Sequence, residues 1–81
     1  MSDALKAVLE DDYALFSLVS VDGEFVKVAK YDKAKKRFWW FNEPGGKYKY
    51  GIMLLSQVGT LKVTRGKYGG EEFDVKAEME Q

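Results

Sequence analysis

The fold of this chain is decided by residues 13–42, which read YALFSLVSVDGEFVKVAKYDKAKKRFWWFN. Valine, leucine and aromatic residues fill the segments on both sides of Asp22-Gly23, the dipeptide that most strongly predicts a two-residue β-hairpin turn. A polar segment, Asp32 to Lys36, then precedes Arg37 to Asn42, whose aromatic content is typical of a strand. The stretch therefore predicts three successive antiparallel strands.

Weaker signals on both sides extend this pattern into a mainly β (α+β) fold. Ser2 is a favourable N-cap for a short helix over residues 2–10, in which Leu5, Val8 and Leu9 share one face. We expect strands over residues 13–21, 24–31, 37–42, 47–56, 60–65 and 72–79. We therefore predict a single domain over residues 1–81, in which the short N-terminal helix precedes a five- or six-stranded antiparallel meander. Since closure removes exposed edges, this sheet is expected to curl into a small barrel or half-barrel.

Two of these segments differ in how clear their pattern is. Residues 47–57 alternate as a strand, but Ile52–Leu55 also suits a helical turn. Residues 72–79 show the clearest alternation, because Phe73, Val75, Ala77 and Met79 are separated by charged residues. That pattern predicts a strand with one buried face and one solvated face.

The hairpin turns set the pairing of the strands and hence the two faces of the sheet. A two-residue turn pairs Val19 with Val26, and a symmetrical second hairpin pairs Tyr31 with Arg37. The face expected to be the core carries Leu15, Ser17, Val19, Val21, Val26, Val28, Phe38 and Trp40. The opposite face mixes aromatic rings with cations and carries Phe16, Leu18, Phe25, Lys27, Ala29, Tyr31, Arg37, Trp39 and Phe41. A slip of one residue would exchange Trp39 with Trp40, but the two rings point to opposite faces in either register.

The composition argues against several kinds of chemistry. The chain contains no Cys and no His, which excludes disulfides, Cys/His zinc sites and imidazole catalysis. The acidic pairs Asp11-Asp12 and Glu71-Glu72 consist of neighbours, which point to opposite sides of a strand and do not converge. We therefore expect a non-catalytic protein without a metal or cofactor.

Charge is segregated along the chain although thirteen basic residues balance thirteen acidic ones. Residues 1–24 carry −5, residues 27–50 carry +6 and residues 51–81 carry −1. No run of about 18 apolar residues is present, and the first residues lack the basic and apolar regions of a secretory signal. We therefore expect a cytoplasmic protein that does not enter a membrane.

Two functional hypotheses follow from the basic, aromatic middle of the chain. The first is single-stranded nucleic-acid binding, in which rings stack on bases and cations contact phosphates. Its candidate residues are Lys27, Tyr31, Arg37, Trp39, Phe41, Lys47, Tyr48 and Lys49. The alternative is a homodimeric protein–protein interaction or assembly module that covers the same apolar face. A third possibility is that the helix over residues 2–10 covers this face and all the rings belong to the core.

Overall fold

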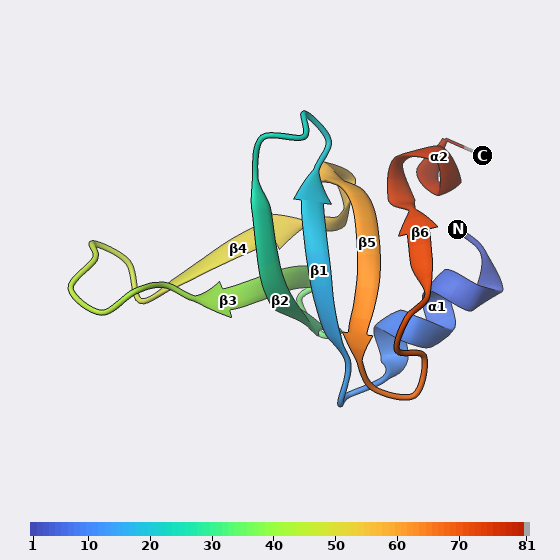
Figure 1. Cartoon of the computed structure of the whole chain (residues 1–81), viewed down its shortest axis with the longest axis horizontal. Coiled ribbons are helices and arrows are strands. Elements are labelled where there is room, and N and C mark those ends of the chain that lie inside the picture. Colours follow the sequence, from blue (N-terminus) through green and yellow to red (C-terminus); the bar gives the residue numbers. More distant parts are fainter. Residues whose placement is uncertain (81) are drawn as a thin grey trace.

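The computed structural model describes residues 1–80 and confirms the predicted fold class, a mainly antiparallel β structure with a short N-terminal helix (Figure 1). Its elements are α1 (Asp3–Glu10), β1 (Leu15–Ser20), β2 (Val26–Asp32), β3 (Arg37–Phe41), β4 (Tyr50–Leu54), the 3₁₀ turn η1 (Leu55–Gln57), β5 (Val58–Arg65), β6 (Glu72–Asp74) and α2 (Val75–Met79). As predicted, Ser2 caps α1: its side-chain oxygen accepts a hydrogen bond from the Leu5 N–H at 3.1 Å.

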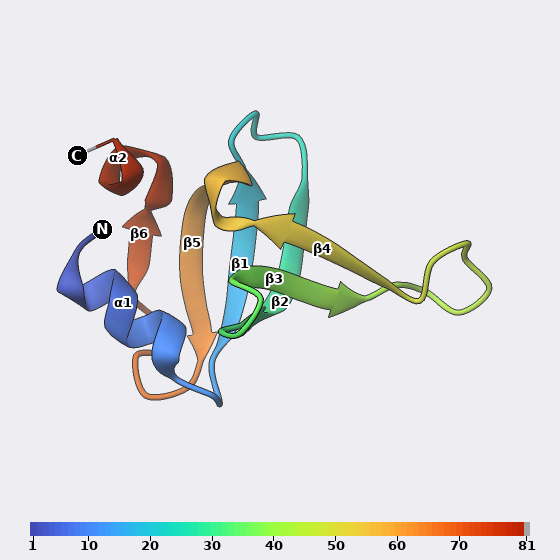
Figure 2. The same ribbon diagram turned by 180° about the vertical axis from the view of Figure 1, so that it is seen from behind.

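The six strands form one sheet in the order β4-β3-β2-β1-β5-β6. Strands β1 to β4 form the predicted meander, but β5 returns to pair with β1 instead of β4. Residues 26–29 of β2 pair with β1, whereas residues 30–32 pair with β3. The β3–β4 hairpin runs across the direction of β1 and β5 (Figure 2). The sheet is not closed into a barrel, because β4 and β6 remain as its two edges.

The prediction of one strand over residues 72–79 is wrong. Strand β6 ends at Asp74, whose carboxylate accepts a hydrogen bond from the Ala77 N–H at 3.0 Å and thereby caps α2. Val75 is buried at the start of this helix, and Met79 lies one helical turn further on. Met79 is 47% exposed and Ala77 is also exposed, so the alternation does not mark a buried strand face, and the Asp74 cap favours the helix.

Other strand boundaries also differ from the expected ones. Residues 13–14, 24–25 and 47–49 lie outside strands, and β5 begins two residues earlier than expected, at Val58. The ambiguous segment contains both of the structures considered for it, since strand β4 is followed directly by the turn η1.

The first hairpin has the predicted register, whereas the second is displaced by one residue. Val19 pairs with Val26 as expected, although the connecting loop is longer than a two-residue turn. In the second hairpin Arg37 pairs with Asp32 rather than Tyr31. The Asp32 carboxylate accepts a hydrogen bond from the Lys35 N–H, and Lys36 adopts a positive φ of 55°, so the loop closes over four residues.

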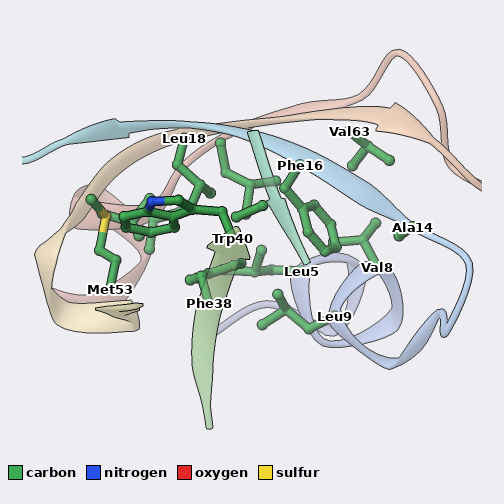
Figure 3. Packing of buried hydrophobic residues seen from close by; sticks show 14 residues of the cluster. Leu5, Val8, Leu9, Ala14, Phe16, Leu18, Phe38, Trp40, Met53 and Val63 are labelled. Carbon is green, nitrogen blue, oxygen red and sulfur yellow. The ribbon is translucent and has the colours of Figure 1, made fainter. Parts of the chain in front are cut away.

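This displacement changes the strand faces that form the core. The prediction that Val26 and Val28 are buried is wrong, because they are 60% and 55% exposed. The core instead lies between α1 and the sheet face that carries Phe16 and Leu18 of β1. Its buried members are Leu5, Val8, Leu9, Ala14, Phe16, Leu18, Ala29, Phe38, Trp40, Met53, Val58, Leu61, Val63 and Val75 (Figure 3). We call the sheet face toward α1 the inner face. Phe38 and Trp40 lie on it, as predicted for the core, but with different partners from β1 and β2.

Asp11 links the end of α1 to the loop between β5 and β6. Its carboxylate accepts hydrogen bonds from the Lys67 N–H at 2.8 Å and from the Tyr13 N–H at 3.0 Å. These bonds lower the pKa of the Asp11 carboxyl, with the Lys67 N–H as the larger cause. Asp11 therefore ties the end of α1 to the loop between β5 and β6.

Gly51 of β4 lies directly under the indole ring of Trp40, and replacing it with alanine should destabilise the protein. A Cβ atom at Gly51 would lie 2.5 Å from Cε2 of Trp40, whose ring is buried. We expect Gly51→Ala to lower the free energy of unfolding by about 1–3 kcal/mol, the usual cost of an overpacked core. Denaturant unfolding would measure this, with Gly46→Ala as the control, since a Cβ there comes no closer than 3.4 Å to another residue. Equal stabilities of the two variants would contradict the contact.

Candidate binding face

The solvent side of β2, β3 and β4 carries an aromatic and cationic surface, which we call the outer face. Strand alternation places its residues opposite the buried side chains of the same strands. Its members are Val26, Val28, Lys30, Asp32, Arg37, Trp39, Phe41, Tyr50, Ile52 and Leu54. Because α1 covers only the inner face, this surface is left to solvent.

Three aromatic rings lie together on the outer face. Trp39 and Phe41 meet edge to face with their centroids 5.1 Å apart. Tyr50 pairs with Phe41 across the β3–β4 ladder and is 54% exposed, while Phe41 itself is 73% exposed. Such exposure is unusual for neighbouring large rings and marks a surface suited to contact with another molecule.

Cations border these rings. Lys30 is the cross-strand partner of Trp39, and Lys35 and Arg37 line a hollow of about 220 Å³. The rest of this hollow is lined by Asp32, Trp39, Phe41, Tyr50 and Ile52. Within residues 1–80 the ion pairs are Lys33–Asp12 at 2.8 Å and Lys62–Glu72 at 3.7 Å, so none involves Lys30, Lys35 or Arg37. The Asp12 carboxylate raises the pKa of Lys33, which lies outside the outer face.

The structure brings together only part of the predicted candidate set. Arg37, Trp39 and Phe41 lie on the outer face, as just described. Tyr31 lies on the inner face, where its ring centroid is 4.8 Å from that of Phe38 and burial raises the pKa of its hydroxyl. Lys27, the half-buried partner of Leu18 in the β1–β2 ladder, also belongs to the inner face.

The remaining candidates lie on the loop between β3 and β4, which extends from the body of the molecule (Figure 1). They are Lys47, Tyr48 and Lys49, and the Lys47 ammonium lies 5.5 Å from the centre of the Tyr48 ring. Asn42 anchors this loop by donating hydrogen bonds to the backbone carbonyls of Tyr48 at 3.3 Å and Lys49 at 2.9 Å. The Trp40 indole N–H in turn donates to the Asn42 side chain, so a core residue fixes the base of the loop.

Four further outer-face residues were not among the predicted candidates: Lys30, Tyr50, Ile52 and Leu54. The alternation of Tyr50, Ile52 and Leu54 was visible in the sequence, but only the observed register places this row beside Arg37 and Trp39. Lys30 was missed because the one-residue displacement of the second hairpin moves it next to Trp39.

Comparison with known proteins gives no independent indication of function. The chain matches no protein-family model, and neither curated proteins nor solved structures gave a significant match. Among the described residues, no helix has the length and apolar character needed to cross a membrane. Nor do residues 1–80 bring three acidic side chains together as a metal site would require.

Proposed function

We propose that this protein binds single-stranded nucleic acid through the outer face of β2, β3 and β4. The observation that carries the proposal is the juxtaposition of two exposed rings, Phe41 and Tyr50, and the half-buried ring of Trp39 with cations that form no ion pair within residues 1–80. Proteins that bind single strands with little sequence preference combine these two elements, often on a β-sheet.

The arrangement suits bases and phosphates at the same time. The faces of the three rings provide stacking surfaces, and each stacked base is worth about 1–3 kcal/mol. Arg37 and Lys35 line the hollow next to these rings, within reach of the phosphates that connect stacked bases. Lys47 and Lys49 add cations on the β3–β4 loop, where a strand leaving the sheet would pass.

The neutral total charge of the chain does not argue against this function. The basic residues concentrate in residues 27–50, which contain most of the outer face, whereas residues 1–24 supply much of the acidic charge. Electrostatic attraction of nucleic acid depends on the local field, so a basic face on a neutral protein is sufficient. We expect the affinity to fall steeply with salt, as it does when cations displace the counterions of phosphates.

Replacing Trp39 should weaken this binding strongly. We expect Trp39→Ala to raise the dissociation constant for a fluorescently labelled single-stranded oligonucleotide about 10- to 100-fold, since it removes one stacking ring. Fluorescence anisotropy at low salt would measure the constant. The matched control is Tyr13→Ala, because Tyr13 is an exposed ring outside the outer face.

Two outcomes would contradict the proposal. One is the absence of binding by the wild-type protein at low salt. The other is equal weakening by Trp39→Ala and Tyr13→Ala, which would show that binding does not depend on the outer face. A circular dichroism spectrum that both variants share with the wild type would establish that the fold is retained.

A further inference from the structure

Strand β4 forms an edge of the sheet and lacks the features that usually protect an edge. Its sequence, Tyr50-Gly51-Ile52-Met53-Leu54, contains no charged residue and no proline. The opposite edge, β6, is only three residues long and carries Glu72 and Asp74. Natural proteins use short strands and charges of this kind to prevent edge-to-edge pairing. Strand β6 therefore carries charges that oppose pairing, whereas β4 carries none.

The backbone of β4 presents donors and acceptors at this edge. The Asn42 N–H donates to the Lys49 carbonyl, so Asn42 and Lys49 form a hydrogen-bonded pair of the antiparallel β3–β4 ladder. Two-residue alternation then directs the N–H and C=O groups of Tyr50 and Ile52 away from β3. The Leu54 N–H also points away from β3, and it donates to the Gln57 side chain at 2.8 Å. The open part of the edge is thus centred on Gly51.

We propose that two copies of this chain pair antiparallel through their β4 edges, with a twofold axis at Gly51. In this register Tyr50 of each copy lies opposite Ile52 of the other, and the two residues exchange backbone hydrogen bonds. Continued along the chain, the same register places Lys49 opposite Met53 of the second copy, so that like charges do not meet. The side chains of Tyr50 and Ile52, now 54% and 48% exposed, become neighbours on one continuous outer face.

The charges favour this edge-to-edge dimer over a dimer formed by the outer faces. Stacking two outer faces would gather Lys30, Lys35 and Arg37 of both copies in one interface, with Asp32 as the acidic residue among them. Like charges brought together at an interface cost several kcal/mol. Pairing through β4 avoids that cost and leaves the outer face exposed, so the dimer does not depend on nucleic-acid binding.

Sedimentation velocity of the full chain over a range of concentrations tests the proposal without nucleic acid. We expect the wild type to form a dimer and Ile52→Lys to raise its dissociation constant at least about tenfold, because a lysine at an edge opposes pairing. The matched control, Val28→Lys, places the same charge on the outer face of β2, away from the β4 edge, and should leave the dimer intact. A wild type that stays monomeric at every concentration, or two variants that behave alike, would overturn the proposal.

Cysteine cross-linking provides a second test that does not depend on the folding of Ile52→Lys. The natural chain has no cysteine, so every disulfide formed would come from the introduced residues. Opposed residues that exchange backbone hydrogen bonds, as Tyr50 and Ile52 of the two copies would, have Cα atoms about 5.5 Å apart, within the range that a disulfide spans. Mild oxidation of Tyr50→Cys/Ile52→Cys should give a disulfide-linked dimer in high yield, whereas Val28→Cys/Lys30→Cys should not. Equal yields from the two double variants would contradict pairing through β4.

Discussion

Replacing Phe38 with alanine should lower the free energy of unfolding by about 3–5 kcal/mol. The side chain of Phe38 is completely buried, and its ring packs edge to face on that of Phe16 at a centroid distance of 5.8 Å. It also contacts the ring of Tyr31. Truncation removes these contacts and leaves a cavity between α1 and the sheet. A loss of this size is a large part of the stability of a small domain, so denaturant unfolding followed by tryptophan fluorescence would detect it readily.

The matched control is Phe41→Ala, on the same strand but on the other face. Phe41 is 73% exposed and loses mainly its contact with the Trp39 ring, so its truncation should lower the free energy of unfolding by no more than about 1.5 kcal/mol. The contrast tests the register of β3, because Phe41 lies three positions after Phe38 on the strand and only Phe38 faces α1. Similar losses for the two variants would contradict the assignment of the inner and outer faces.

The sequence was sufficient to predict the fold class but not the strand faces that are buried. The β1–β2 register agrees with the one expected from Asp22-Gly23, although the loop is longer than a two-residue turn, and Ser2 marks the start of α1. The second hairpin was displaced because the Asp32 side chain and the positive φ of Lys36 favour a four-residue loop, which the spacing alone does not reveal. A register error of one residue transfers a whole strand to the other face, and Val28 was therefore predicted to be buried.

The candidate site was predicted in part for the same reason. The alternation within Arg37-Phe-Trp-Trp-Phe places Arg37, Trp39 and Phe41 on one face in any register, so this group was correctly placed together. Tyr31 was assigned to the same face through the pairing between β2 and β3, and it lies on the other. Contacts within a strand depend on local geometry alone, whereas contacts between strands depend on loop lengths and on which face the helix covers.

The docking of α1 provides a second large effect, tested by replacing Leu5 with alanine. Leu5 is fully buried and lies among the core side chains beneath the sheet (Figure 3). We expect Leu5→Ala to lower the free energy of unfolding by about 2–5 kcal/mol, the usual range for truncating a buried leucine. An eight-residue helix is too short to be stable in isolation, so its loss of packing should also reduce the helical signal in circular dichroism.

Lys6→Ala is the control for Leu5→Ala, because Lys6 is the exposed neighbour of Leu5 on the same helix and truncating the lysine should leave the stability nearly unchanged.

The same pair of variants separates the two faces of the sheet. Since α1 covers only the inner face, Leu5→Ala measured under conditions where it remains folded should bind single-stranded oligonucleotide with the affinity of the wild type. A loss of affinity in the folded variant would mean that the binding surface includes the helix. A stability change as small as that of Lys6→Ala would mean that α1 is not part of the core.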